Sequence, residues 1–418
     1  MAHIEDRWYR TQDGKRTPTL LCGRGLRYRV RYTDPDGRER SKSFPDRDRR
    51  AAEAFLVTVE ADKLRGSYID PRAGRITLRR YASDWLAAQT FDESTREATE
   101  SRLRVHVYPH LGDRGLGAIR PSHVQAWDRA LQQQNVAPTY RRVLFANLSA
   151  IFAAAVDDER IAKNPCRAAS VKPPRLVARK VTPWSREQVL QAHGALPRRY
   201  RVAATLAAGC GLRQGEVFGL AVDDVEFLGR TLHVVRQVKI VRGQLAFALP
   251  KGRKTRDVPL PDTVTTELAA HIAAFPPLAV TLPWETPRGN PSTALLVLYS
   301  RERTALNRRY FNSHVWKAAL AAAGIQPSRD NGMHALRHFY ASVLLDAGES
   351  VKALSEYLGH SDPGFTLRTY THLLPTVSSG RGRPSTARSR VLQRRPTACP
   401  RPRSETEQCF RWSPACEP

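Results

Sequence analysis

Alternation of apolar and polar residues marks the first element that the chain predicts, a strand over residues 26–32. One face of this strand is apolar. The other face carries three arginines, Arg27, Arg29 and Arg31. The turn sequence DPDG at residues 34–37 then allows residues 38–44 to return as a second strand. Apolar residues at helical spacing predict a helix over residues 49–64, whereas residues 1–25 look polar and irregular.

These elements predict an N-terminal domain of residues 1–70, in which one helix backs a small sheet. An arginine row on the open face of a sheet suits a reader of the DNA major groove, so the three arginines are candidate DNA contacts. A half-buried strand whose arginines are merely solvated explains this segment equally well.

Residues 75–169 predict a helical domain, set off from the first by a hinge at residues 71–75. Apolar and aromatic stripes at helical spacing, as in residues 140–156, indicate core positions of four to five helices. Five arginines on these helices are candidate phosphate contacts, although each alone would serve as a solvated surface charge. They are Arg96, Arg102, Arg104, Arg141 and Arg142.

The last folded unit, residues 182–375, follows a basic linker with Pro-Pro at residues 170–181. Ser185 predicts the N-cap of its first helix, and the unit is expected to be mostly helical with one small sheet near its start. The expected strands cover residues 232–240 and 245–249, and the later helices residues 263–274, 300–323, 334–345, 351–358 and 366–373. The expected fold class is therefore mainly α with small β-sheets, in several domains.

Charge indicates the partner. Lys and Arg number 67 against 40 Asp and Glu, a formal net charge of +27, so a polyanion and above all nucleic acid is expected. A membrane surface is the alternative, but the sequence has no apolar run of the roughly 18 residues that a span needs, and no signal peptide. A soluble cytoplasmic protein is expected. The six cysteines form no C-x-x-C pair, so neither a zinc site nor a disulfide framework is predicted.

The densest group of reactive side chains lies within residues 332–372. It combines cationic and proton-transferring groups with one phenol, and such a set suits chemistry on an anion. Its members are His334, Arg337, His338, His360 and Tyr370. Arg213, just after a sharp glycine turn, and Lys251, in a turn between two predicted strands, add further cations.

The order and spacing of these residues resemble those of the tyrosine recombinase, or phage integrase, family. The matching segments are GCGLRQGE with Arg213, LPKGRKTRDVPL with Lys251, HALRH with His334 and Arg337, LGH with His360, and TLRTYTH with Tyr370. The helical segment HVYPHLGDRGLGAIRPSHV is similar to the core-site-binding domain of that family. More weakly, the N-terminal sheet resembles the arm-site-binding domains of larger integrases.

The resemblance implies cleavage through a 3′-phosphotyrosyl intermediate. Two guanidiniums, Arg213 and Arg337, can bind the non-bridging oxygens of a phosphodiester and stay charged at any working pH. His360 would hydrogen-bond the same phosphate.

Proton transfer falls to the other residues of the set. Tyr370 is the nucleophile on this reading, and because a free tyrosine has a pKa of about 10 it needs a base. His334, on the same helical face as Arg337, can take or hold that proton, and Lys251 can protonate the leaving 5′ oxygen. The intermediate keeps the ester energy, so no ATP, metal or other cofactor is expected.

Metal binding or structural support, rather than catalysis, is the alternative role for His334, His338 and Glu216. His334 and His338 have the i, i+4 spacing of a zinc helix, but Ala335 stands where a metalloprotease has Glu, and no third ligand is evident. His338 is expected to pack or to support other residues rather than to act directly. Glu216 is expected to be a structural partner of a nearby basic group.

The sequence thus predicts a site-specific recombinase that integrates and excises a phage or mobile element, acting as a homo-tetramer on double-stranded DNA attachment sites. An excision factor or a host DNA-bending protein would be further partners. A catalytically inactive DNA-binding relic, a chromosome-dimer-resolving recombinase and a simple topoisomerase are the alternatives. Residues 376–418, rich in Arg, Pro and Ser, depart from the family and are expected to be a disordered tail.

Overall fold

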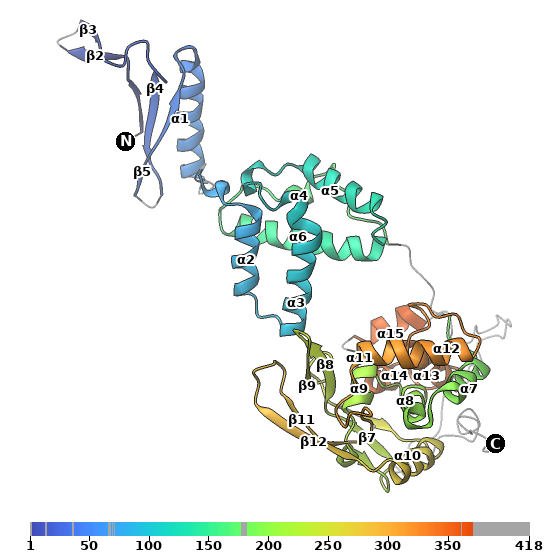
Figure 1. Ribbon diagram of the computed structural model, residues 1–418. Helices are drawn as coiled ribbons and strands as arrows, with labels where there is room; N and C mark the ends of the chain where they lie inside the picture. Colours follow the sequence, from blue (N-terminus) through green and yellow to red (C-terminus); the bar gives the residue numbers. More distant parts are fainter. Residues whose placement is uncertain are drawn as a thin grey trace, which may run out of the picture. The chain divides into compact units, whose positions relative to one another are not determined.

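The computed structural model describes residues 2–12, 15–35, 37–65, 68, 70, 72–176, 182–360 and 362–370. The chain divides into two units, Met1–Val177 and Ala178–Pro418 (Figure 1). The end of the predicted linker, residues 177–181, and the predicted tail, residues 376–418, lie outside the described residues. None of the helices in the described part of the chain has the length and apolar character that a bilayer span requires.

An antiparallel sheet with strand order β1-β4-β5 begins the first unit. Its strands are β1 (His3–Asp6), β4 (Tyr28–Thr33) and β5 (Glu39–Phe44). The alternating residues Tyr28, Val30 and Tyr32 are buried in one core with residues of α1 (Arg49–Leu64), which follows the short turn η1 (Asp46–Asp48). The predicted sheet and helix are therefore confirmed.

The expectation that residues 1–25 are irregular was wrong. They contain β1 and a second hairpin, formed by β2 (Tyr9–Gln12) and β3 (Lys15–Pro18). Every residue of β3 is exposed, so this strand needs no apolar face and its sequence shows no alternation. Leu26 is exposed as well, because the strand begins only at Tyr28.

Helices form the rest of the first unit, as the sequence predicts. They are η2 (Ala73–Arg75), α2 (Leu78–Ala88), α3 (Glu93–Arg102), the π-helical turn η3 (Leu103–Val107), α4 (Tyr108–Leu111), η4 (Leu116–Ala118), α5 (Pro121–Gln133), α6 (Pro138–Asp157) and η5 (Pro165–Arg167). Thr77 and Asp92 begin α2 and α3 by accepting a hydrogen bond from a backbone N–H three residues on. The predicted apolar face of α6 is buried in the core beside Trp127.

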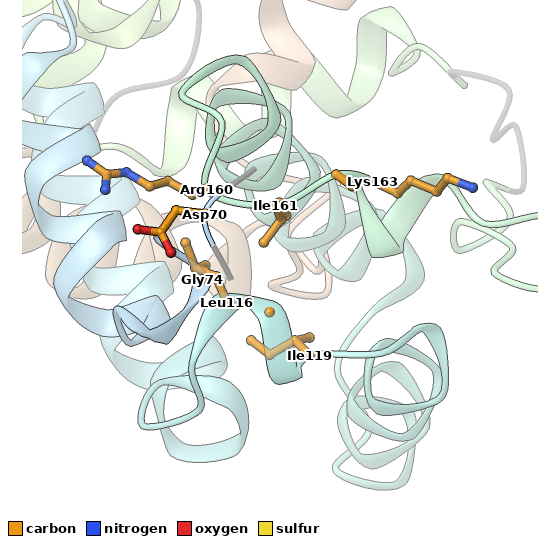
Figure 2. A pocket seen from close by; sticks show the side chains of 9 residues that line it. Asp70, Gly74, Leu116, Ile119, Arg160, Ile161 and Lys163 are labelled. Atoms are coloured by element: carbon orange, nitrogen blue, oxygen red, sulfur yellow. The ribbon is translucent and has the colours of Figure 1, made fainter. Parts of the chain in front are cut away.

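A pocket of about 310 Å³ opens on this helical part, between η2, η4 and the segment that follows α6 (Figure 2). Its lining residues are Asp70, Gly74, Leu116, Gly117, Ile119, Arg160, Ile161, Ala162 and Lys163. No residue of the predicted catalytic set contributes to this lining.

The second unit contains three small sheets in its described residues, not the one sheet expected. Their strands are β6 (Val225–Glu226), β7 (Thr231–Val234), β8 (Gln237–Val241), β9 (Gln244–Ala248), β10 (Arg256–Pro259), β11 (Leu278–Pro283) and β12 (Pro291–Leu296). The single strand expected over residues 232–240 is two strands, β7 and β8, which pair in different sheets. The hairpin β11–β12 was missed.

Helices form much of the rest of the second unit. They are α7 (Arg186–Ala195), α8 (Arg198–Gly209), α9 (Gln214–Gly219), the turn η6 (Val222–Asp224), α10 (Asp262–Ala274), α11 (Arg308–Tyr310), the π-helical turn η7 (Phe311–Trp316), α12 (Lys317–Ala322), α13 (His334–Asp346), α14 (Val351–Leu358) and α15 (Pro363–Tyr370). Ser185 caps α7 with Gln188, as predicted. The helix expected from residue 300 begins only at Arg308, because the side chain of Asn307 accepts hydrogen bonds from two backbone N–H groups and caps it there.

Candidate active site

The glycine turn between α8 and α9 positions Arg213. Gly211 has a φ of +64°, and a Cβ atom there would lie 2.4 Å from Cδ1 of Tyr340, so only glycine fits this close approach. Arg213 follows at the N-cap of α9, and its backbone N–H donates to Oε2 of Glu216 at 2.9 Å. Its side chain donates from Nη1 to Oε1 of Glu216 at 2.9 Å and from Nη2 to the carbonyl of Gly359 at 3.2 Å.

Glu216 is the buried carboxylate of this site, with a relative exposure of 1%. Besides Arg213 it binds Arg256, which donates from Nη1 at 3.0 Å and from Nη2 at 2.6 Å. Burial by itself would raise the pKa of Glu216, but the hydrogen bonds and charge of Arg256 and the charge of Arg213 lower it to about 2. Glu216 is therefore the structural partner that the sequence indicates, while Arg256 was missed.

Arg337, on the first turn of α13, is also fully buried, at 1% exposure. Nη1 donates to the carbonyl of Gly211 at 2.6 Å, and Nη2 donates to the carbonyl of Leu358 and to Nε2 of His360, the latter at 3.2 Å. Burial and then the charge of Arg213 lower the pKa of Arg337 to about 9, so that the guanidinium remains charged at neutral pH.

His360 is a neutral imidazole held between two partners. An arginine can only donate hydrogen bonds, so Nε2 of His360 accepts from Arg337. The proton then lies on Nδ1, which donates to Oγ1 of Thr366 at 2.6 Å. Burial, followed by the charges of Arg337 and Arg213, lowers the pKa of His360 to about 4 and keeps this tautomer neutral.

Lys251 and His334 lie at the rim of the site. Lys251 is exposed in the turn between β9 and β10, as predicted, and its charge acts on His334 at the start of α13. Desolvation by surrounding atoms and then the charges of His338, Arg337, Arg213 and Lys251 lower the pKa of His334 to about 4, although its side chain still reaches solvent.

Tyr370 ends α15 and is almost entirely buried, at 2% exposure. Its hydroxyl lies 2.7 Å from Nδ1 of His338. Burial raises the pKa of Tyr370 to about 12, against the opposing charges of Arg337 and Arg213. The sequence predicts that His338 packs or supports other residues, whereas the structure places it against the Tyr370 hydroxyl. In the sequence, only its spacing four residues from His334 indicates that it lies on the same helical face as that histidine.

The site has an excess of positive charge. Arg213 and Arg256 bind the one carboxylate, that of Glu216, and Arg337 adds a third guanidinium, which leaves two positive charges (three minus one). Such a site can bind an anionic phosphodiester beside a phenol nucleophile. Among the residues that the structure describes, no three His, Cys, Asp or Glu side chains are grouped as metal ligands.

The candidate DNA contacts of the N-terminal sheet are paired with acidic residues of the same domain. Arg27 bridges Asp6 at 2.9 Å and Asp46 at 2.6 Å, while Arg31 and Arg29 lie 3.1 and 4.0 Å from Glu5. The arginines at this sheet are therefore accompanied by carboxylates, Glu5 and Asp6 from β1 and Asp46 from η1.

The candidate phosphate contacts of the helical domain differ in exposure. Arg141 is buried and pairs with Asp128 at 3.1 Å, and Arg96 donates to the carbonyls of Leu86 and Gln89, so both support the fold. Arg104 and Arg142 are exposed, Arg102 is half-buried, and Arg142 also donates to the carbonyl of Pro174.

The fold and the site define a tyrosine-type DNA strand-transfer enzyme. Two family models match the chain: "Phage integrase central domain" over residues 78–171 and "Phage integrase family" over residues 182–376. The chain belongs to the phage integrase family of tyrosine recombinases.

Individual relatives agree with this assignment. The integrase of Mycobacterium phage FRAT1 is 28% identical over 71% of this chain and 84% of its own length. A XerC-like tyrosine recombinase of Caldanaerobacter subterraneus subsp. tengcongensis is 27% identical over 83% of this chain and 93% of its own. A lambda integrase tetramer, solved on a Holliday junction, shares the fold with a TM-score of 0.53, 19% identity, and coverage of 81% of this chain and 91% of that one.

Proposed function

We propose that this protein is a site-specific recombinase that cuts and rejoins duplex DNA to integrate and excise a phage or mobile element. One observation carries the proposal: a net positive cluster of buried and partly buried guanidiniums lies beside the phenol of Tyr370. Membership of the tyrosine recombinase family supports the same reaction.

Arg213 and Arg337 hold the scissile phosphate in this mechanism. A guanidinium has five N–H donors, and the hydrogen bonds between described residues use two in the side chain of Arg213 and three in Arg337. Each arginine therefore keeps further donors for the non-bridging oxygens, whose charge grows in the transition state. The hydrogen bond to Thr366 fixes the tautomer of His360, and Nε2 of His360 then accepts a hydrogen bond from Arg337 and positions its guanidinium.

Strand cleavage then requires balanced proton transfers. The Tyr370 oxygen forms a bond to phosphorus as the bond from phosphorus to the 5′ oxygen breaks, which leaves a 3′-phosphotyrosyl ester. The phenol gives up its proton in this step, and the 5′ oxygen gains one from Lys251, which is exposed at the end of its turn. Attack by the 5′-hydroxyl of a partner strand reverses these events and completes the exchange.

The partners of this reaction follow from its chemistry. Two attachment-site duplexes exchanging strands need four active sites, so we infer a homo-tetramer, an assembly in which lambda integrase was solved on a Holliday junction. An excision factor or a host DNA-bending protein would set the direction of the reaction. DNA of the host nucleoid, in the cytoplasm, is where we expect the protein to act.

The alternatives fit the chain less well. An inactive relic would have no reason to keep Arg213, Arg337 and Tyr370 in one charged site. The N-terminal sheet domain favours integration and excision over resolution of chromosome dimers or simple relaxation, which would not need this extra domain.

Covalent trapping tests the proposal. The full chain is incubated with nicked duplexes from the DNA that flanks its gene, so that a short 5′ fragment diffuses away after cleavage, and SDS-resistant adducts are counted on a gel. We expect an adduct with wild type and with Tyr299→Phe, at a half-buried tyrosine of the same unit, and none with Tyr370→Phe. DNA that is bound normally in a gel shift but never joined to wild type would contradict the proposal.

A further inference from the structure

The hydrogen bond between His338 and Tyr370 joins two helices at the reacting atom. His338 lies on the second turn of α13, and its Nδ1 is 2.7 Å from the hydroxyl oxygen at the end of α15. The two rings are 5.7 Å apart between centroids, with an interplanar angle of 62°. We propose that His338 accepts the phenol proton of Tyr370 during strand cleavage, an inference that rests on the proposed function.

Geometry favours His338 over His334 for this role. Within the described part of the chain, the imidazole that contacts the Tyr370 hydroxyl is that of His338. The ring of His334 packs edge-on against that of His338, with 4.6 Å between the ring centroids, and the charge of Lys251 acts on it. His338 is therefore the histidine placed to take the proton of the nucleophile.

The imidazole of His338 is neutral in this site, which leaves a nitrogen lone pair for the phenol proton. Burial and the neighbouring charge of Arg337 lower its pKa to about 4, so the ring is neutral and Nδ1 can accept a hydrogen bond from the phenol. As the bond from oxygen to phosphorus forms, the phenol proton moves to Nδ1. The new imidazolium then faces the growing negative charge of the phosphate, and it returns the proton when the 5′-hydroxyl attacks and the tyrosine leaves.

Two substitutions separate proton acceptance from positioning. His338→Asn places an amide oxygen near the position of Nδ1, so it can hold the phenol but cannot take its proton, whereas His338→Ala removes both functions. Since general-base catalysis contributes about 10²–10⁴-fold, we expect both variants to cleave nicked duplexes at least about 100-fold more slowly than wild type in single-turnover assays. His233→Gln, at a histidine of β7 that is paired with Asp257 of the neighbouring strand β10, is the matched control and should keep the wild-type rate.

A more acidic phenol distinguishes loss of the proton acceptor from a structural defect, because a lower phenol pKa would restore the cleavage rate only in the first case. Difluorotyrosine in place of Tyr370 lowers the pKa of the nucleophile, so it should raise the cleavage rate of His338→Asn by about tenfold or more and change that of the otherwise wild-type chain little. Gel shifts and circular dichroism establish that each variant folds and binds DNA.

The outcomes are distinct. If His338→Asn cleaves within about threefold of the wild-type rate, His338 only positions the phenol. If it cleaves faster than wild type, the contact with Tyr370 inhibits cleavage. Either result overturns the inference, while the adduct formed by wild type still upholds the proposed function. A slow variant that difluorotyrosine does not rescue also overturns it. If wild type forms no adduct on DNA that it binds, the proposed function fails first, and the inference fails with it.

Discussion

Glu216→Gln tests how the arginine site is built. Both oxygens of Glu216 accept hydrogen bonds from Arg256 and Arg213, and the side chain is buried. A glutamine of the same size presents an amide NH₂ to guanidiniums that can only donate, and it cannot neutralise their charge. The substitution therefore leaves buried positive charge without its partner, which is among the more costly changes a folded protein can suffer.

The pKa of Glu216 gives the magnitude. Desolvation would raise this pKa, but Arg256 and Arg213 lower it from 4.5 to about 2. At about 1.4 kcal/mol for each pH unit, the difference corresponds to about 3 kcal/mol, close to the 3–5 kcal/mol typical of a broken buried pair. We expect Glu216→Gln to lower the free energy of unfolding of the second unit by about 3 kcal/mol at pH 7.

The pH dependence of this effect has a definite sign. Because the folded-state pKa lies below that of the unfolded chain, the stabilisation is complete above about pH 5 and is lost as the pH falls toward 2. Glutamine does not titrate. The difference in stability between wild type and Glu216→Gln should therefore narrow steadily over this window.

Urea titrations at several pH values between about 2 and 7, each followed by a short hydrogen-exchange pulse at one fixed pH, provide the assay. Mass spectrometry of peptides from α8, α9 and α13 then reports the second unit alone, which avoids treating a chain of two units as one two-state transition. Asp262→Asn, which breaks the exposed pair with Arg230, is the control and should cost less than about 1 kcal/mol. If Glu216→Gln matched this control, or kept the pH dependence of wild type, the reasoning would be refuted.

Two further substitutions probe the leaving group and the glycine turn. Lys251→Ala should slow cleavage of ordinary DNA about 100-fold, yet barely affect cleavage of DNA with sulfur as the 5′ bridging atom, because a thiolate leaves without a proton. Single-turnover cleavage of both substrates, followed on gels, measures the two rates. Equal losses of rate on both substrates would exclude Lys251 as the proton donor. Gly211→Ala should destabilise the second unit by about 1–3 kcal/mol in the same urea assay, since its Cβ meets the ring of Tyr340. Gly243→Ala, with a φ of +80° and no atom within 4 Å, carries only backbone strain of about 1 kcal/mol; equal effects would contradict the packing argument.

Local signals explain which elements could be predicted from the sequence. The helices α1 and α14 run over the residues expected, 49–64 and 351–358, because periodic apolar residues and end signals fix both limits. β4 was found for a similar reason, since its buried face alternates. The order of the catalytic residues also needed no structure, because it resembles a family pattern.

Elements without a local signal were missed. Strand β3 is exposed throughout, so its sequence has no apolar face to reveal it, and the hairpin β11–β12 is bounded by prolines that weaken a strand signal. The pair of Arg256 with Glu216 joins residues forty positions apart, and that of His338 with Tyr370 joins residues thirty-two apart. Such contacts depend on how helices and hairpins return to one place, which no local pattern encodes.

The catalytic arginines also complete the helices around them. Leu358 and Gly359 end α14, where carbonyl groups have no partner within the helix, and Gly359 turns away with a φ of +60°. Arg337 and Arg213 donate to these two carbonyls, so the same guanidiniums that would bind the phosphate fix the end of α14. A lysine at Arg337 would keep a positive charge but could not bridge Gly211, Leu358 and His360 with a planar fork. Loss of activity in such a variant would therefore report a displaced helix end together with a lost phosphate contact, because fold and chemistry use the same hydrogen bonds.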